Sequence, residues 1–222
     1  MVEQRVLEKL YLQKRYSVSE ISKKLGISQG QINYYLEKYG IQKRSIRDSA
    51  YLKWNPNGDP FKVSRPNSIN AAFLFGLGMG LYWGEGTKMS KTLVRLANSD
   101  PRLILSFLNF LKNTCGIDAL RLRCGLQIFG DMNVDKALSF WSKKLKIPVS
   151  RFYKLVVTPH RGVGNYRQKT KYGVLTIYFN NRKLRDILVA AIERIDGKAD
   201  VAQLVEHVLG GSQTPAHLRS NV

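Results

Sequence analysis

The N-terminal part of the chain places its apolar residues at helical spacing in three successive segments. The apolar positions of these segments are Val6, Leu10 and Leu12; Ile21 and Leu25; and Ile32, Tyr35 and Leu36. Residues three or four apart lie on one face of a helix, so each segment predicts a helix with one buried stripe. The pattern therefore predicts a three-helix unit over residues 1–44.

Residues between these stripes have the chemistry of helix ends. Ser17 and Glu20 have the spacing of a capping box, which predicts a helix start at Ser17. Gly26 predicts the end of that helix, because a tight turn favours a residue that tolerates positive φ. Ile27 is expected to be a buried plug in the turn, and Ser28 is expected to cap the next helix.

The segment ISKKLGISQGQINYYLEKYGI, residues 21–41, resembles the helix-turn-helix family. The resemblance implies a recognition helix from Ser28 to Tyr39 whose first exposed residues enter the major groove of DNA. The expected contacts of this helix are Ser28, Gln29, Gln31, Asn33 and Tyr34. Gln and Asn are suited to this role, because each pairs bidentately with adenine. The expected phosphate contacts are Lys23, Lys24, Lys38, Lys43 and Arg44. A module that binds protein instead of DNA is the alternative.

Elements of both kinds follow in the larger part of the chain. Helices are predicted from residue 71 to the Gly84-Glu85-Gly86 segment and over residues 103–111, 134–145 and 182–195. Strands are predicted within 92–101 and over 120–129, 152–158 and 174–179. Asn98 or Ser99 is expected to cap the second of these helices, with Pro101 at its first position. The order α-β-α-β-α-β-β-α predicts an α+β domain over residues 71–196.

Two segments lack such a pattern. Residues 45–70 contain Asn-Pro, Asn-Gly, Asp-Pro and Arg-Pro, which predicts a linker, although Tyr51 and Trp54 are expected to pack partly on a neighbour. Residues 197–222 are neutral and predict a disordered or non-functional tail. Within it, the stretch 201–207 can be encoded by GTAGCTCAGTTGGTAGAGCAC, which resembles the D-arm of a tRNA gene, so we hypothesise that the reading frame runs into such a gene.

The net charge of the chain adds a prediction about its partner. The chain has 36 Lys and Arg against 16 Asp and Glu, a net charge of +20, which predicts a polyanionic partner. Residues 136–185 contain thirteen Lys and Arg and no Asp or Glu. Within this stretch, the expected DNA contacts are Arg161, Arg167, Lys169 and Lys171 in a loop. Before it, Arg121 and Arg123 are expected to contact DNA from one face of a strand. A solvated loop is the alternative for the first group, and RNA is the alternative partner for the whole basic surface.

The segment 71–88, AAFLFGLGMGLYWGEGTK, has an unusual glycine pattern. Gly76, Gly80 and Gly84 recur every four residues and share one helix face, although each glycine costs about 1 kcal/mol relative to alanine. A face without side chains predicts close approach of another helix. Glu85 follows at the C-terminal end, where the helix dipole disfavours a carboxylate, which indicates a nearby metal ion or lysine.

The sequence GLYWGEG at residues 80–86 resembles the LAGLIDADG family of homing endonucleases and their relatives, with Glu85 where the family carries its catalytic acid. The stretch 92–101 looks like the strand and helix start that follow the family motif. The resemblance implies an α/β-saddle domain laid across double-stranded DNA. It also implies a homodimer that packs through Gly76, Gly80 and Gly84, and Mg²⁺ held by Glu85 for phosphodiester hydrolysis. Lys88 or Arg95, close in sequence, is expected to stabilise charge.

Other functions are less well supported. A non-catalytic transcriptional regulator with the same two domains is the main alternative, and an ion pair of Glu85 with Lys88 is the structural alternative for the acid. No spacing typical of a Ser-His-Asp triad, a nucleotide site or a zinc site is present. The two cysteines do not form a CxxC pair. The charged N-terminus and the short apolar run 71–84 predict a cytoplasmic protein without a membrane partner.

Overall fold

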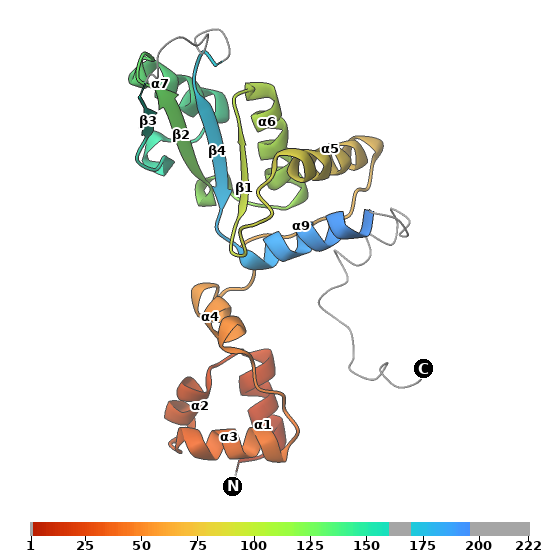
Figure 1. Cartoon of the computed structure of the whole chain (residues 1–222). Coiled ribbons are helices and arrows are strands. Elements are labelled where there is room, and N and C mark those ends of the chain that lie inside the picture. The colour runs from red at the N-terminus through yellow and green to blue at the C-terminus, as the bar shows by residue number, and fades with distance from the viewer. Residues whose placement is uncertain (1, 160–169, 196–222) are drawn as a thin grey trace. The chain divides into compact units, whose positions relative to one another are not determined.

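The computed structural model describes residues 2–159 and 170–195, which belong to two compact units divided between Pro60 and Phe61. The fold is mixed α+β: the described elements of the first unit are helices, and the second unit combines helices with a four-stranded sheet (Figure 1). The predictions for Arg161, Arg167, Lys169 and the tail 197–222 concern residues outside the described ranges.

The first unit contains the three predicted helices and a fourth that was not predicted. Its elements are α1 (Gln4–Glu8), which continues into the π-helical turn η1 (Lys9–Gln13), then α2 (Val18–Leu25), α3 (Gln29–Lys38) and α4 (Ile46–Trp54). Its core is formed by Leu7, Leu10, Tyr11, Ile21, Ile32, Leu36 and Ile41. The prediction for Val6 and Leu12 is wrong: both are exposed, because the buried stripe of the first helix runs through residues 7, 10 and 11.

The helix ends of this unit follow the sequence pattern. Ser17 and Glu20 form the predicted capping box, and Gly26 closes α2 with φ of 68° in the left-handed region, which glycine adopts without strain. Ser28 caps α3 as predicted. Ile27 is only half-buried, so it is less enclosed than the expected plug.

The segment expected to be a linker is partly helical. Ser45 accepts a hydrogen bond from the backbone N–H of Asp48 and so begins α4. None of the residues of α4 is buried, and Trp54 is 83% exposed, so the packing expected of this tryptophan is not observed. Tyr51 is half-buried and donates a hydrogen bond to Asp59 Oδ1 at 2.9 Å. Residues 45–59 of the segment are ordered by caps and turns, whereas Phe61 is buried in the core of the second unit and the backbone N–H of Lys62 donates to the carbonyl of Cys115 at 2.9 Å.

The second unit has the predicted order of helices and strands. Its elements are α5 (Ile69–Glu85), β1 (Val94–Asn98), α6 (Pro101–Asn109), η2 (Phe110–Thr114), η3 (Ala119–Arg121), β2 (Arg123–Phe129), α7 (Val134–Leu145), η4 (Val149–Arg151), β3 (Val156–Thr158), β4 (Val174–Phe179) and α9 (Arg182–Ile195). The bounds predicted for α7, β4 and α9 are confirmed. The others shift at one or both ends.

Two predictions at the ends of elements are wrong, and the first of them concerns predicted site residues. Strand β2 begins at Arg123, while Arg121 lies in the preceding turn η3, so the two arginines do not share a strand face. The turn forms because Asp118 accepts the backbone N–H of Leu120 at 2.9 Å. Helix α6 is capped by Asp100 rather than by the expected neighbours, because its carboxylate accepts the N–H of Arg102 at 2.8 Å.

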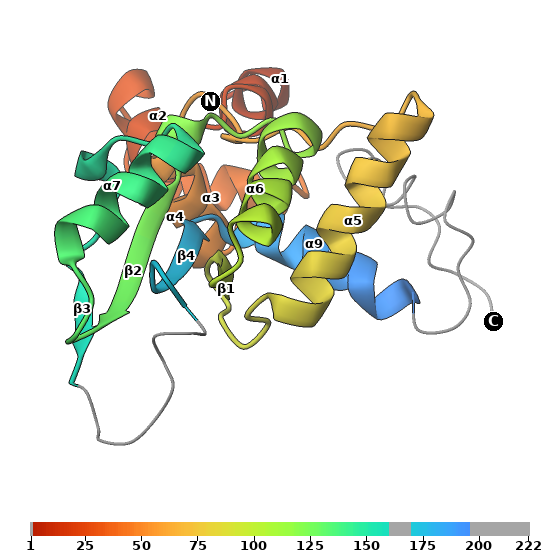
Figure 2. The same ribbon diagram turned by 90° about the horizontal axis from the view of Figure 1, so that it is seen from above.

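The sheet has the strand order β1-β4-β2-β3, with β2 and β3 parallel and the other pairs antiparallel. On its inner face, Leu96, Ile177 and Cys124 are cross-strand neighbours and are buried. Helices α6 and α7 lie on this side and contact each other (Figure 2). The opposite, outer face carries the side chains that alternate with these along each strand.

Candidate functional site

Helix α5 presents its three regularly spaced glycines on an exposed face. A Cβ atom added at Gly76, Gly80 or Gly84 would meet no atom within 4 Å among the described residues, apart from its chain neighbours and the nearby backbone of α5 itself. Phe73 is 69% exposed and Trp83 is 48% exposed, so the surroundings of these glycines are apolar. We call this surface, residues 73, 76, 80, 83 and 84, the glycine face. It is apolar, and none of the described residues covers it.

A fourth glycine of α5 explains how the helix is held. Gly78 is buried, and a Cβ atom there would lie 2.1 Å from Cγ of Phe110. Phe110 begins the π-helical turn η2, and its ring stacks on Phe107 of α6 at 5.9 Å between centroids. One side of α5 therefore packs tightly on the core, while the glycine face stays open.

Glu85 ends α5 and is exposed. No hydrogen bond or ion pair to its carboxylate is found among residues 2–159 and 170–195. The ammonium of Lys88 donates a hydrogen bond to the carbonyl of Trp83, so the alternative of a Glu85–Lys88 ion pair is not observed. A cation at this place is favoured, because the last carbonyls of a helix carry partial negative charge.

The turn after Glu85 is fixed from two sides. The backbone N–H of Thr87 donates to the carbonyl of Arg95 in β1 at 2.9 Å. From α9, Arg185 donates through Nη2 to the carbonyl of Lys88 at 2.6 Å, and through Nη1 to Asp186 Oδ1 at 3.0 Å. Sequence reasoning missed Arg185, because nothing local connects it to a turn almost a hundred residues earlier.

A polar residue is enclosed beside this turn. Tyr82 has no exposed surface, and its hydroxyl has no hydrogen-bond partner among the described residues. Burial raises the pKa of Tyr82, with the positive charge of Arg185 opposing the shift. Its ring stacks on Phe107, which makes Tyr82 part of the core that supports the end of α5.

A basic row crosses the outer face of the sheet next to the same turn. Arg95 of β1, Tyr178 of β4 and Arg123 of β2 are direct cross-strand neighbours. The guanidinium carbon of Arg95 lies 5.4 Å from the centre of the Tyr178 ring, and Arg123 donates to the carbonyl of Ser150 at 3.2 Å. We call these three residues the outer row. Because the backbone of Arg95 is hydrogen-bonded to Thr87, the outer row lies next to the segment that follows Glu85.

In the first unit, α3 buries Ile32 and Leu36 and exposes its first turn. The predicted contacts that are exposed are Ser28, Gln29, Gln31, Tyr34 and Lys38, while Asn33 is half-buried. The side chain of Gln31 is also part of the helix cap, because its Oε1 accepts the backbone N–H of Ser28 at 3.0 Å.

Arg44 is held within the first unit. Its guanidinium donates to the carbonyls of Arg15 and Tyr16 and lies 4.0 Å from the ring centre of Tyr11. The backbone N–H of Arg44 also donates to the Tyr11 hydroxyl at 2.8 Å. The structure thus gives this side chain a packing role, and its contact with phosphate stays a prediction.

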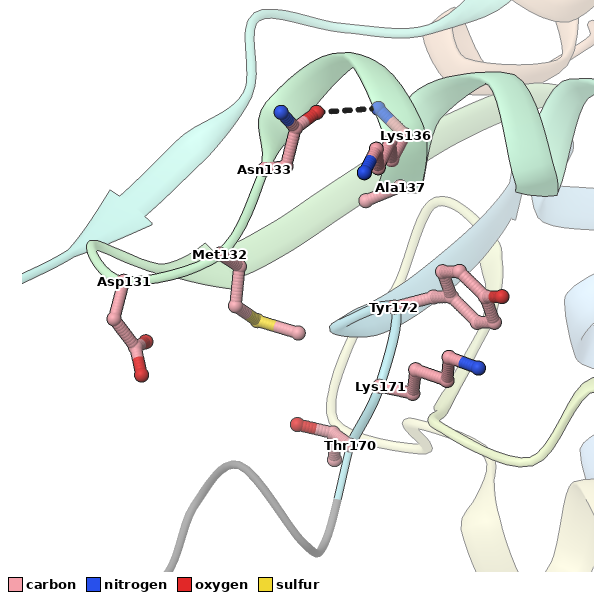
Figure 3. Close-up of a pocket in the computed structure, with 8 residues that line it drawn as sticks. All are labelled: Asp131, Met132, Asn133, Lys136, Ala137, Thr170, Lys171 and Tyr172. Carbon is pink, nitrogen blue, oxygen red and sulfur yellow. Dashed lines mark hydrogen bonds between the residues drawn. The ribbon is translucent and has the colours of Figure 1, made fainter.

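A pocket of about 280 Å³ lies between the start of α7 and the residues before β4 (Figure 3). It is lined by Asp131, Met132, Asn133, Lys136, Ala137, Thr170, Lys171 and Tyr172. Asn133 accepts the backbone N–H of Lys136 at 2.8 Å and so caps α7. Lys171 is the one predicted contact that lines the pocket, and neither Glu85 nor the outer row takes part.

The remaining chemistry of the described ranges is limited. They contain no group of three or more His, Cys, Asp and Glu side chains arranged to hold a metal ion. Burial raises the pKa of Cys115 and of Cys124 to about 12, so both thiols stay protonated and unreactive at neutral pH. No helix in the described part of the chain has the length and apolar character needed to cross a membrane.

No protein-family model, curated protein or solved structure matches the chain. The resemblances to the helix-turn-helix and LAGLIDADG families are therefore carried by the quoted residues alone. What the chain does has to be argued from the glycine face, Glu85, the outer row and the exposed turn of α3.

Proposed function

We propose that the chain is a sequence-specific, double-stranded DNA-binding protein that acts as a homodimer. The observation that carries this proposal is the outer row, in which Arg95 and Arg123 flank Tyr178 beside the end of α5. Arginine presents a planar set of donors that suits phosphates and the acceptor edge of guanine. The net charge of +20 supports a polyanionic partner.

The first unit supports recognition of sequence. Helix α3 begins with an exposed turn that carries Gln29 and Gln31, followed by Tyr34, which is 60% exposed. Polar side chains at the start of a second helix are the groups that a helix-turn-helix presents to bases. In this proposal α3 selects the site, and the basic second unit contributes most of the affinity through backbone contacts.

We further propose that the dimer is a metal-dependent DNA endonuclease of the homing type, with Glu85 as its acid. Mg²⁺ is held by one or two carboxylates together with water and substrate phosphates. An exposed carboxylate that has no partner within residues 2–159 and 170–195 fits this ion. Glu85 would hold the ion, which would activate water and stabilise the leaving oxygen. Lys88 and Arg185 hold the turn after Glu85 and so orient this residue.

A non-catalytic transcriptional regulator is the second candidate. The engagement of Lys88 with the carbonyl of Trp83 favours it, because the ammonium expected to stabilise charge is already used to cap α5. Each chain also offers one acid at this place, Glu85. In this reading the same surfaces bind DNA and no bond is broken.

Binding is tested by selecting DNA sites from a random duplex pool with the full chain and measuring affinity by fluorescence anisotropy. We expect Arg95→Gln and Arg123→Gln each to cost about 1–3 kcal/mol of binding free energy and to lower the salt slope by about one where a phosphate contact is lost. Arg102→Gln is the matched control, because its side chain is 91% exposed on α6 and carries the same charge. Equal losses in all three variants, or no selected site, would contradict the proposal.

Cleavage is tested on a supercoiled plasmid that carries the selected site. We expect nicked or linear product with Mg²⁺, none with EDTA, and none with Glu85→Gln, which keeps DNA binding. Tight binding without product in the wild type would leave the regulator as the function.

A further inference from the structure

Helices α2 and α3 begin with the same cap but complete it with different residues. In α2 the capping box joins Ser17 and Glu20, and in α3 it joins Ser28 and Gln31. Each serine Oγ accepts the backbone N–H three residues later, at 3.2 Å in α2 and 3.1 Å in α3. The two helix starts can therefore be compared directly, because their capping boxes share a serine and differ in the last residue, which is glutamate in α2 and glutamine in α3.

The side chains of Glu20 and Gln31 use their hydrogen-bonding groups differently. Oε2 of Glu20 accepts both the N–H and the hydroxyl of Ser17, each at 2.7 Å. Oε1 of Gln31 accepts the N–H of Ser28 at 3.0 Å, and this N–H requires the amide oxygen rather than the nitrogen. The Nε2 group of Gln31 has no hydrogen-bond partner among the described residues.

Capping alone does not account for an amide at this position. A carboxylate in the first turn is favoured by the helix dipole, so Glu would cap α3 at least as well as Gln. Gln31 is exposed, on the side of α3 away from Ile32 and Leu36. What glutamine adds over glutamate is two N–H donors without negative charge.

We propose that Gln31 contacts DNA as a hydrogen-bond donor only, through Nε2, to an acceptor atom in the DNA. This inference depends on the proposed function and makes it more specific. Bidentate pairing with adenine requires the amide to present its oxygen and nitrogen together, and Oε1 of Gln31 is held on the backbone of Ser28. The acceptor is N7 of guanine or adenine, O6 of guanine, O4 of thymine, or a phosphate oxygen.

The test compares the wild type with Gln31→Glu on the selected site and on its single-base variants. Glutamate keeps the capping box, as α2 shows, but turns the donor into a charged acceptor. We expect the melting temperature to be unchanged or higher and the affinity to fall about tenfold or more, from the lost hydrogen bond and the repulsion of the acceptor. A loss that depends on the base at one position identifies a base acceptor, and a loss that is equal on all single-base variants identifies a phosphate.

The double variant Glu20→Gln/Gln31→Glu is the matched control, because it exchanges the two capping residues and keeps the net charge of +20. We expect it to bind as weakly as Gln31→Glu, while Glu20→Gln alone binds as the wild type does. Two results would overturn the inference while leaving the proposed function intact. The first is unchanged affinity of Gln31→Glu, and the second is an adenine whose 6-amino group is needed by the wild type but not by Gln31→Glu, which indicates bidentate pairing. A wild type that selects no DNA would overturn both.

Discussion

Arg44 shows how a basic side chain in a strongly basic protein becomes structural. Its guanidinium donates to two backbone carbonyls and covers the ring of Tyr11, and its Nε is buried with no hydrogen-bond partner among the described residues. Both terminal nitrogens of the guanidinium are thus already engaged inside the unit.

We expect Arg44→Met to lower the free energy of unfolding of the first unit by about 2 kcal/mol, because hydrogen bonds from a charged donor contribute about 1.5–3 kcal/mol. Hydrogen–deuterium exchange of the full chain would show faster exchange in α2 and α3. Lys43→Met is the control, since its 3.9 Å contact with Glu37 is an exposed pair of little effect. Equal exchange in both variants would show that Arg44 is not structural.

Gly78 marks the tight side of α5, where an added methyl group would overlap the Phe110 ring. We expect Gly78→Ala to destabilise the second unit by about 1–3 kcal/mol despite the better helix propensity of alanine, because overpacking a dense core forces backbone shifts. Urea unfolding of the full chain measures this difference. A more stable Gly78→Ala variant would show that α5 can move away from Phe110.

At the scale of elements, the capping box of α2 makes the first unit sensitive to acid. The backbone N–H and then the hydroxyl of Ser17 hold the pKa of Glu20 below its usual value of 4.5. Because the folded state has the lower pKa, this contribution to stability is fully present above about pH 4.5 and is lost as the pH falls through the folded pKa.

The measurement is an NMR titration of the Glu20 side chain in the full chain, with thermal unfolding at each pH. We expect a midpoint below 4.5 and an acid-induced loss of stability that is smaller in Glu20→Gln. A midpoint at or above 4.5 would mean that the capping box opens in solution.

The elements predicted correctly from sequence are those with a long, regular apolar pattern. Helix α7 and strand β4 have the predicted bounds, because amphipathic spacing and β-branched residues specify them locally. The start of β2 after Arg121 and the cap of α6 at Asp100 were predicted wrongly. In both places a side-chain hydrogen bond from one of several neighbouring polar residues fixes the end of the element, and the sequence pattern does not show which residue makes it.

The candidate site was predicted less completely than the fold. Glu85 and the glycine positions follow from a local motif, whereas Tyr178 and Arg185 reach the end of α5 only through strand pairing and a helix from the end of the described chain. Contacts between residues so far apart leave no local pattern. The prediction that Trp54 packs on a neighbour is wrong for a different reason. A large aromatic residue predicts burial, but none of the residues of α4 is buried.

At the scale of the whole molecule, the glycine face and the single acid raise the same question of oligomeric state. Each chain carries one Glu85, and a dimer through α5 would bring two of them to one DNA duplex. Gly80 lies at the centre of the glycine face, with no atom of the described residues within 4 Å of an added Cβ apart from its chain neighbours and the nearby backbone of α5 itself. A larger side chain there is therefore accommodated in the single chain but not in a close helix pair.

We expect the wild type to sediment as a dimer, Gly80→Ala to dimerise more weakly, and Gly80→Leu to be monomeric with an intact fold. Alanine also raises the stability of the single chain by about 1 kcal/mol, because it favours the helix more than glycine does. Weaker dimerisation together with higher stability of the single chain would indicate a lost interface, whereas a damaged fold would lower both. Analytical ultracentrifugation and thermal unfolding measure the two quantities, and a dimeric Gly80→Leu variant would place the interface elsewhere on the chain.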